Sequence, residues 1–335
     1  MSRDFFLEKT AVVGAGLMGS QTALVLALGS RETWLISRRQ QTLDRAFENL
    51  RRYARDLHRH NRLGGETPED VLQRIRTTTD LKDAVRGATF VLETITEDLS
   101  AKQALFQQID ALVPPDVLLA SNTSGLPITR LAERAVHKSR IAGSHFVQPG
   151  HIVPVVEVIR SEHTSEEAMD RIVAIWEKLG WLALRVNRDV PGFLINRLQH
   201  AVIREAVHLL ATGVARAEDI DLAFRLGLAP RFTTAGPLEQ RDINGLSMHV
   251  RVAGHLWETL GGWEEPLAYL QDMVAGGKTG LESGQGYYDW SGRNPMDVRK
   301  EKDEHLLRRT RQVMDTWEAE EKNRRHPQFQ GPKKG

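Results

Sequence analysis

Candidate strands alternate with longer stretches of helical periodicity through the first half of the chain. The candidate strands are residues 11–13, 33–36, 77–80, 88–92 and 117–120. Between them, residues 18–28 and 42–63 place apolar side chains three and four positions apart, as amphipathic helices do. This alternation predicts an α/β domain with a doubly wound, mostly parallel sheet covered by helices on both faces.

The hydrophobic pattern changes after residue 186, and from there to the tail its period is helical. The apolar helical stretches are residues 191–210, 217–226, 238–260 and 266–274. The first of them has Pro191 in its first helical turn. We therefore expect an α/β domain over residues 1–186, an all-α domain over 187–292, and a C-terminal segment over 293–335. In that segment we expect a charged helix from Glu301 to Lys322 and a frayed tail over residues 326–335. Helices this apolar in a small domain commonly pack against a second copy, so we expect a homodimer through residues 187–292.

Three glycines follow the first strand in the order Gly14-x-Gly16-x-x-Gly19. In a strand–turn–helix context the first glycine makes the turn, the second admits a pyrophosphate close to the backbone, and the third lets the helix pack on the strand. The unpaired N–H groups at the helix N-terminus then favour the diphosphate. A Rossmann-type dinucleotide site is the leading interpretation, and a merely tight turn is the alternative.

The residues after the second strand bear on which dinucleotide is bound. An NAD site normally places Asp or Glu there to accept hydrogen bonds from the ribose hydroxyls, whereas this chain has Ser37-Arg38-Arg39. A small hydroxyl beside two guanidinium groups suits a 2′-phosphate. The sequence therefore favours NADP slightly. If the arginines are only solvated loop residues, NAD remains the cofactor.

The predicted helix over residues 42–63 carries a basic face formed by Arg51, Arg55, Arg59 and Arg62. A run of charges at this spacing is usually a solvated helix face. The alternative is a docking surface for a phosphorylated substrate handle such as coenzyme A.

Composition narrows the class of protein. The 335 residues include 41% hydrophobic residues, no cysteine and a net charge of +1. A net charge this close to zero does not attract the protein as a whole to nucleic acid or to membranes. The lack of cysteine excludes disulfides, thiolate catalysis and Cys-ligated zinc. We expect no metal site. The start of the chain lacks an apolar export segment and no apolar run could span a bilayer, so we expect a cytoplasmic protein acting on a small molecule.

A histidine and a glutamate on successive strand segments carry the candidate chemistry. Oxidising a secondary alcohol with a nicotinamide requires a base, and histidine is the side chain that most often serves as one, which makes His145 a candidate. Glu157 could orient its ring and stabilise the imidazolium. Taken alone, they could equally be an incidental histidine and a surface carboxylate. Ser37, Glu97 and Ser124 fall at the carboxyl ends of strands, where ligands bind in such sheets.

With these motifs in view, residues 8–292 resemble the 3-hydroxyacyl-CoA dehydrogenase family, including its lambda-crystallin and gulonate dehydrogenase relatives. The matching motifs are the glycine loop with Met18, Ser121-Asn-Thr-Ser124, His145-Phe-x-x-Pro149, Pro154-x-Val-Glu157, Pro191-Gly-Phe-x-x-Asn196-Arg-Leu, Gly236-Pro-Leu and Lys278-Thr-Gly.

The resemblance implies roles for matching positions. It makes His145 the catalytic base, Glu157 its orienting carboxylate, and Ser124 and Asn196 the residues that hold the substrate oxygens. It places Glu97 and Lys102 on the nicotinamide side. The cofactor residues it implies are Gly14, Gly16, Leu17, Met18, Gly19, Asn122, Glu97 and Lys102, to which the strand-end reasoning adds Ser37, Arg38 and Arg39.

Three departures from the family pattern bear on the substrate and cofactor. Gln148 stands where many members have Asn, Ser37 where they have Asp, and Asp56 where acyl-CoA enzymes tend to keep a lysine. The first and third weaken the inference to an acyl-CoA substrate, and the second weakens NAD specificity.

The resemblance implies an oxidoreductase that moves a hydride between a 3-hydroxy group and a nicotinamide. The substrate is then a 3-hydroxyacyl-CoA or a related 3-hydroxy acid, with a gulonate- or carnitine-like alcohol as the alternative. A beta-hydroxyacid dehydrogenase would need a catalytic lysine within residues 191–210, which contain none. A non-catalytic dinucleotide-binding protein, as in lens crystallins, is the remaining possibility.

Overall fold

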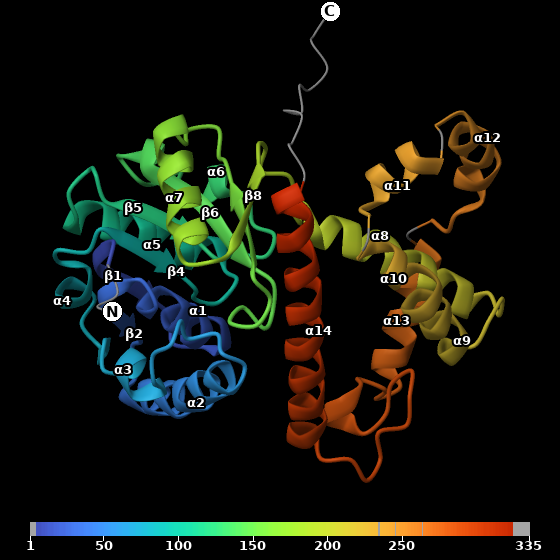
Figure 1. The fold of residues 1–335 in the computed structure, drawn as a ribbon, viewed down its shortest axis with the longest axis horizontal. Helices are drawn as coiled ribbons and strands as arrows, with labels where there is room; N and C mark the ends of the chain where they lie inside the picture. The colour runs from blue at the N-terminus through green and yellow to red at the C-terminus, as the bar shows by residue number, and fades with distance from the viewer. Residues whose placement is uncertain (1–4, 234, 245, 263, 324–335) are drawn as a thin grey trace, which may run out of the picture. The chain divides into compact units, whose positions relative to one another are not determined.

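The computed structural model describes residues 5–233, 235–244, 246–262 and 264–323. The chain divides into two compact units, Met1–Arg197 and Leu198–Gly335 (Figure 1). The first unit therefore extends past the boundary expected near Asn187. The reason is local, since backbone N–H groups of Leu194 and Ile195 donate to Glu157 within the sheet and hold this segment in the first unit.

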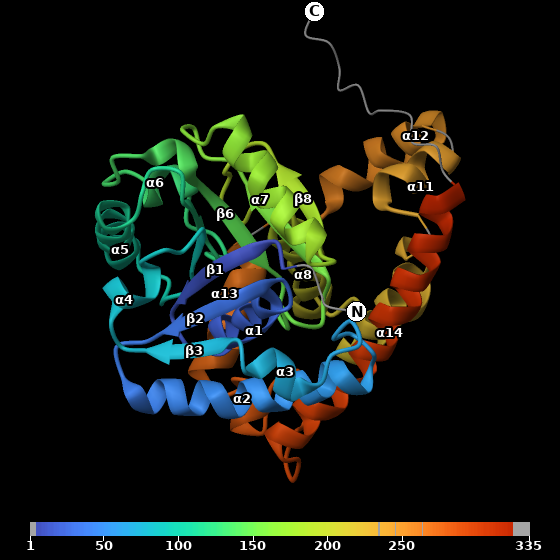
Figure 2. The same cartoon turned by 60° about the vertical axis from the view of Figure 1, so that its left-hand side comes forward.

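The first unit is built on one eight-stranded sheet in the order β3-β2-β1-β4-β5-β6-β7-β8. The strands are β1 (Leu7–Val13), β2 (Ser30–Ile36), β3 (Ile75–Thr78), β4 (Phe90–Glu93), β5 (Leu118–Ser121), β6 (Ile141–Phe146), β7 (Val155–Ile159) and β8 (Leu182–Val186). Every pairing is parallel except β6 with β7, and β1, β2 and β3 can be followed side by side in Figure 2. The strand order reverses between β1 and β4, which is the switch point of a doubly wound fold. The predicted Rossmann-type sheet is confirmed.

Helices cover both faces of this sheet. They are α1 (Leu17–Ala27), α2 (Gln40–Arg59), α3 (Pro68–Leu72), α4 (Leu81–Val85), α5 (Leu99–Leu112), α6 (Ile128–Leu131) and α7 (Glu166–Lys178), with the short 3-10 helix η1 (Lys138–Arg140) before β6. The helix starts follow capping rules. Thr67 and Asp70 form a reciprocal capping box at α3, while Asp98 and Ser165 cap α5 and α7.

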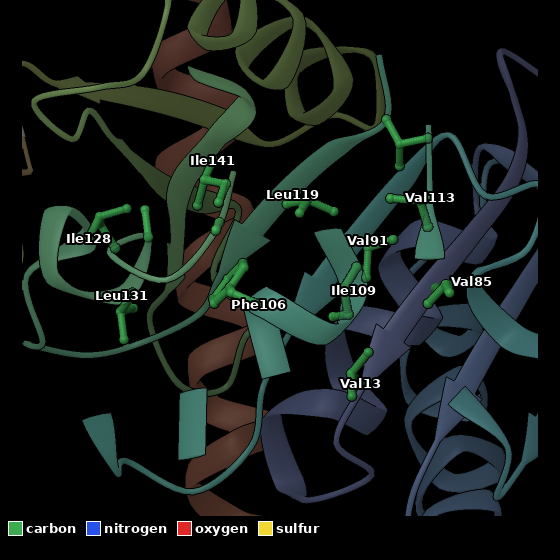
Figure 3. Packing of buried hydrophobic residues seen from close by; sticks show 14 of the residues in the cluster. Val13, Val85, Val91, Phe106, Ile109, Val113, Leu119, Ile128, Leu131 and Ile141 are labelled. Carbon is green, nitrogen blue, oxygen red and sulfur yellow. The ribbon is translucent and has the colours of Figure 1, made fainter. Parts of the chain in front are cut away.

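The core on one face shows how strand periodicity fixes the packing. Val13 and Val91 from neighbouring strands meet Phe106 and Ile109 of α5 in one buried cluster (Figure 3). Because successive strand side chains point to opposite faces, Val12 is buried on the other side of the sheet. The central strands β4 and β5 are buried along their whole length, as expected for a sheet covered on both faces.

The second unit is helical, as predicted. After the long helix α8 (Ile195–Ala211), which crosses the boundary between the units, its elements are α9 (Ala217–Leu222), the π-helical turn η2 (Ala223–Leu228), α10 (Ala229–Phe232), α11 (Pro237–Asn244), α12 (Leu246–Leu256), η3 (Trp257–Thr259), α13 (Glu264–Ala275), η4 (Leu281–Ser283) and α14 (Pro295–Asn323). The stretch 238–260, predicted as one helical run, is divided between α11, α12 and η3. No helix in the described ranges is long and apolar enough to cross a membrane.

Two helix starts differ from the sequence prediction. Helix α8 begins at Ile195 and not at Pro191, because Gly192 and Phe193 adopt positive φ angles of 76° and 50° that no right-handed helix accommodates. Helix α14 begins at Pro295, before the predicted Glu301, and the Asn294 side chain accepts the Met296 N–H at 2.9 Å. The predicted frayed tail over residues 326–335 lies outside the described residues.

Candidate active site

The glycine loop joins β1 to α1 at the carboxyl edge of the sheet. Gly14 has a φ of 115°, and Gly16 is the N-cap of α1, where no side chain provides a capping hydrogen bond. A Cβ at Gly19 would lie 1.8 Å from the Gly14 carbonyl oxygen, so only glycine fits there. A Cβ at Gly16 would meet nothing within 4 Å. The loop therefore presents open backbone and an uncapped helix N-terminus, which fits a pyrophosphate.

Leu17 and Met18 form the exposed start of α1 beside this loop. Leu17 is 45% exposed, and Met18 is partly buried. The Met18 methyl group lies close to Gly150, since a Cβ built there would be 3.1 Å from it. Both residues thus lie at the edge of the predicted dinucleotide site.

The end of β2 presents Ser37-Arg38-Arg39 at the same edge. The Ser37 N–H donates to the Thr78 carbonyl at 3.3 Å, and its side chain is half-buried. Arg38 and Arg39 are exposed, and within the described part of the chain neither guanidinium has a carboxylate partner. No carboxylate from this segment could repel a 2′-phosphate.

A buried ion pair joins the end of β4 to α5. Lys102 donates to Glu93 Oε1 at 2.6 Å, and each side chain is only 1% exposed. Lys102 also lies 3.3 Å from Glu97 Oε2, while the Ser121 hydroxyl donates to Glu93 Oε2 at 2.6 Å. Lys102 is thus buried, whereas the side chain of its partner Glu97 is half-exposed. The predicted direct contact of Lys102 with a cofactor stays a prediction.

Glu97 connects this pair to the β5 turn. Its Oε1 accepts hydrogen bonds from the Thr123 hydroxyl and from the Ser124 N–H, the latter at 3.0 Å. Burial alone would raise the pKa of Glu97, but the Thr123 hydrogen bond and the Lys102 ammonium outweigh it and lower the pKa below its usual range. The Glu97 carboxylate is therefore ionised at neutral pH.

Asn122, Ser124 and Asn196 converge on the same turn. The Asn122 Oδ1 accepts the Phe146 N–H at 2.9 Å, which fixes the end of β6 against β5. The Asn196 side-chain amide donates to the Ser124 carbonyl oxygen at 3.0 Å, and the Ser124 side chain is exposed. The structure thus brings together the two residues predicted to hold substrate oxygens.

His145 and Glu157 are direct partners across the antiparallel pair of β6 and β7. His145 Nδ1 lies 2.6 Å from Glu157 Oε2, with His145 5% exposed and Glu157 fully buried. The carboxylate makes Nδ1 the protonated nitrogen, which leaves Nε2 as the acceptor. No other described group bonds the His145 ring. Glu157 is therefore not a surface carboxylate, and the role of His145 as a base stays a prediction.

Glu157 also anchors the start of α8. Its Oε1 accepts N–H groups of Leu194 at 2.8 Å and Ile195 at 2.9 Å, so it caps this helix from a neighbouring strand. Burial alone would raise the pKa of Glu157, but hydrogen bonds from His145 and the two N–H groups lower it below its usual range. The Phe193 ring lies 5.8 Å from the His145 ring, between their centroids.

The loop between β6 and β7 carries the exposed Gln148 and is fastened at several points. The Gly150 N–H donates to the buried Gln21 of α1 at 2.7 Å. Trp181 donates its indole N–H to the Val153 carbonyl oxygen at 3.1 Å, and the buried His151 stacks on Tyr53 of α2 at 4.3 Å. This loop thereby spans from the catalytic strand pair to the glycine loop.

Several site residues escaped the sequence prediction. Glu93, Thr123 and Gln21 hold the predicted residues in place, but each reads as an ordinary polar residue in the sequence. The one available signal was Glu93 itself, a carboxylate that directly continues an apolar strand run. Within the described ranges no cluster of three or more His, Asp or Glu side chains could hold a metal ion.

Because of the strand order, these groups lie one after another along the carboxyl edge of the sheet. The glycine loop follows β1, the Glu93–Lys102–Glu97 cluster follows β4, Ser124 follows β5, and His145 lies on β6. A dinucleotide on the loop and an alcohol beside His145 would therefore approach each other over the ends of β4 and β5. This arrangement can support hydride transfer coupled to proton removal.

Comparisons with known proteins identify the family of the chain. The family model for the 3-hydroxyacyl-CoA dehydrogenase NAD binding domain matches residues 9–190, and that for the C-terminal domain matches residues 192–290. Two curated relatives are a 5-formyl-3-hydroxy-2-methylpyridine 4-carboxylate 5-dehydrogenase of Mesorhizobium japonicum and a probable 3-hydroxybutyryl-CoA dehydrogenase of Deinococcus radiodurans. The first is 31% identical, and the match covers 90% of this chain and 96% of the relative. The second is 36% identical, and the match covers 84% of this chain and 100% of the relative.

A solved structure shows the same architecture. The crystal structure of a 5-formyl-3-hydroxy-2-methylpyridine 4-carboxylic acid 5-dehydrogenase, described as an NAD⁺-dependent dismutase, matches with a TM-score of 0.85 and 30% identity. The match covers 92% of this chain and 99% of that one. From the two family models and these relatives together, the chain belongs to the 3-hydroxyacyl-CoA dehydrogenase family of NAD-dependent oxidoreductases.

Proposed function

We propose that the protein oxidises the 3-hydroxy group of a 3-hydroxyacyl-CoA or a related 3-hydroxy acid to the 3-oxo product, with a nicotinamide dinucleotide as hydride acceptor. The observation that carries the proposal is the 2.6 Å contact between His145 Nδ1 and Glu157. It leaves Nε2 as a base at the edge of the sheet where the glycine loop also lies. Retention of this buried pair argues against a non-catalytic binding protein.

The residues divide the chemistry between them. The bound nicotinamide supplies a hydride acceptor for the hydrogen on C3. His145 Nε2 takes the hydroxyl proton as the carbonyl forms, and the ionised Glu157 stabilises the resulting imidazolium. Ser124 and Asn196 are proposed to hold the substrate oxygens. The loop anchored by Gln21 keeps the base and the glycine loop in register.

The arginines predicted on the basic face of α2 bear on whether coenzyme A docks at that face. Arg51 pairs with Glu48 at 2.7 Å, and Arg59 pairs with Asp56, both on the same helix. Arg62 donates to the Ile152 carbonyl oxygen. Helix α2 ends at Arg59, so Arg62 lies beyond the helix and not on its face as predicted. Two of the three arginines left on this face have partners on the same helix, which supports its interpretation as a largely solvated surface.

A second candidate substrate is a compact carboxylated ring compound. It is favoured by the similarity to the pyridine-carboxylate dehydrogenase, which extends over 90% of the chain and includes a TM-score of 0.85. The same base and the same hydride acceptor would serve an alcohol or hydrated aldehyde on such a ring.

We also propose that NADP is accepted at least as well as NAD. Support comes from Ser37, which replaces the carboxylate expected of an NAD site. It comes also from the exposed Arg38 and Arg39, which have no carboxylate partner among the described residues. Because both guanidinium groups are exposed, the preference should be modest and should weaken as salt rises.

For assembly, we propose a homodimer through the helical unit. Large apolar side chains are exposed there, among them Leu226 at 71%, Leu238 at 78% and Trp257 at 64%. Exposed apolar groups in this number are typical of protein interfaces. Light scattering at micromolar concentration should give twice the monomer mass.

A substrate panel tests the proposed function. The protein is incubated with NAD or NADP and short 3-hydroxyacyl-CoA esters, free 3-hydroxy acids, carnitine-like alcohols or carboxylated ring alcohols, and cofactor reduction is followed. Reduction with any 3-hydroxy compound supports the proposal. Activity confined to ring compounds favours the second candidate, and no reduction with any compound contradicts both.

A further inference from the structure

The Glu93–Lys102–Glu97 triad lies between the two ends of the proposed reaction. In the sheet order, β4 and β5 separate β1, which precedes the glycine loop, from β6, which carries His145. Glu93 is the last residue of β4, and Glu97 bonds the Ser124 N–H beyond β5. A hydride that passes between a cofactor on the loop and a carbon beside His145 must therefore cross above this triad.

The triad holds one cation between two carboxylates. Lys102 Nζ lies 2.6 Å from Glu93 Oε1 and 3.3 Å from Glu97 Oε2. The remaining partners of Glu93 all donate to it, since the Ile95 N–H reaches Oε1 and the Ser121 hydroxyl reaches Oε2, each at 2.6 Å. Burial raises the pKa of Glu93 even with these donors present. The geometry is that of an ionised carboxylate, because the Lys102 ammonium, the Ile95 N–H and the Ser121 hydroxyl all donate to its two oxygens. With Lys102 charged, the triad carries a net charge of minus one.

Stability alone does not explain such a cluster. Removing two charges from water costs several kcal/mol per ion, and a buried pair is often no better than a well-packed apolar pair. Ser121 and Ile95 would bind a neutral amide at position 93 as well. A neutral amide at position 93 would, however, remove the net negative charge that the triad places below the path of the hydride.

We propose that the net negative charge of the Glu93–Lys102–Glu97 triad makes the site prefer the oxidised nicotinamide, whose ring is cationic, over the reduced ring, which is neutral. The proposal rests on the proposed function, because it requires a nicotinamide cofactor in this site. Glu93 then acts as a positioning and electrostatic residue without touching substrate. Opposite charges attract most strongly where water is excluded, and the buried side of the triad is such a place.

Cofactor binding without turnover tests this proposal. Glu93→Gln keeps the size of the side chain and removes one negative charge, which leaves the triad neutral. The ratio of NADH to NAD⁺ dissociation constants, measured by calorimetry without substrate, should fall about 5- to 30-fold. The change should come mainly from weaker NAD⁺ binding. An unchanged ratio in the folded variant overturns the proposal.

Two further variants separate charge from structure. Ser121→Ala removes a hydrogen bond to Glu93 without changing charge, so it should leave the ratio within about twofold of the wild type. The double variant Glu93→Gln with Lys102→Met restores a net charge of minus one and should return the ratio toward the wild-type value. A ratio shifted equally by Ser121→Ala would show that geometry, not charge, is responsible, and would overturn the proposal.

If Glu93→Gln does not fold, the same test can be made with a variant of Glu97, whose side chain is half-exposed. Glu97→Gln also makes the triad neutral and should lower the ratio in the same direction. If Glu97→Gln leaves the ratio unchanged, the proposal fails even while the substrate panel still shows dehydrogenase activity. If neither cofactor form binds the wild-type protein, the proposed function itself fails.

Discussion

Two sets of charged residues lie at the same edge of the sheet, and they differ in burial. His145, Glu157, Glu93 and Lys102 are at most 5% exposed, and each bonds a partner across strands or helices. Arg38 and Arg39, after β2, are exposed and have no carboxylate partner among the described residues. Buried pairs are costly to break, whereas exposed charges are screened by water and salt. We therefore expect large mutational effects in the first set and small ones in the second.

The largest effect is expected at His145. His145→Ala should lower turnover by roughly 10²- to 10⁴-fold, because no other described group is placed to take the hydroxyl proton. Cofactor affinity, measured by titration, should stay nearly unchanged, since the ring does not contact the glycine loop. Near-normal turnover would remove His145 from its role as base.

Glu157→Gln should lower turnover by roughly 10- to 10³-fold. The amide can still bond His145, but it cannot stabilise the imidazolium by charge. Because the two residues act as a unit, the loss in the double variant with His145→Ala should be close to that of His145→Ala alone. Additive losses would show that the two side chains act independently.

The same variant has a stability consequence that depends on pH. The folded-state pKa of Glu157 lies below its ordinary value, so ionisation stabilises the folded protein at neutral pH. This contribution is lost as pH falls below the ordinary carboxylate range. Denaturant titrations should therefore show wild type more stable than Glu157→Gln at neutral pH, with the difference shrinking in acid. A difference that grows on acidification would contradict the assigned direction.

A smaller effect is expected at the exposed end of β2. Ser37→Asp should lower kcat/KM for NADP relative to NAD by about tenfold, because a carboxylate there repels a 2′-phosphate and accepts from the ribose hydroxyls. The wild-type preference for NADP should decline as salt increases. Strong NAD preference in the wild type, or no change in the variant, would show that this segment does not face the ribose.

The smallest effect is expected on the basic face of α2. Arg55 is exposed and lacks a carboxylate partner among the described residues, so it is the arginine of this face best placed to meet a ligand. If the face is solvated, Arg55→Ala should change KM for a 3-hydroxyacyl-CoA by less than about twofold. Arg51→Ala, which removes a side chain already paired with Glu48, is the matched control. A tenfold increase for Arg55→Ala alone would indicate that coenzyme A docks there.

The sheet and the pairing of His145 with Glu157 could be predicted from the sequence because both involve local patterns. Strand and helix periods differ, and the glycine spacing marks one turn, so the doubly wound half could be predicted element by element. His145 and Glu157 were predicted as a pair on successive strand segments. Their direct register across β6 and β7 came only from the structure.

What escaped prediction depends on contacts between distant segments. The start of α8 was misplaced because Phe193, a non-glycine residue next to Gly192, also takes a positive φ there, while Glu157 from β7 caps the helix. Glu93 could not be recognised as the partner of Lys102, since their pairing depends on how α5 packs beneath the β4 turn. Substrate choice is likewise set by packing that no spacing rule encodes.

One labelling measurement tests the central claim most directly. A 3-hydroxy substrate that turns over in the panel is prepared with deuterium on C3, and reduced cofactor is analysed by mass spectrometry after a single turnover. The wild-type protein should transfer the deuterium to the nicotinamide, and His145→Ala should bind the cofactor yet transfer it at least about 100-fold more slowly. Cofactor that carries no deuterium from the wild type, or transfer at an unchanged rate by His145→Ala, would contradict a dehydrogenase built on the His145–Glu157 pair.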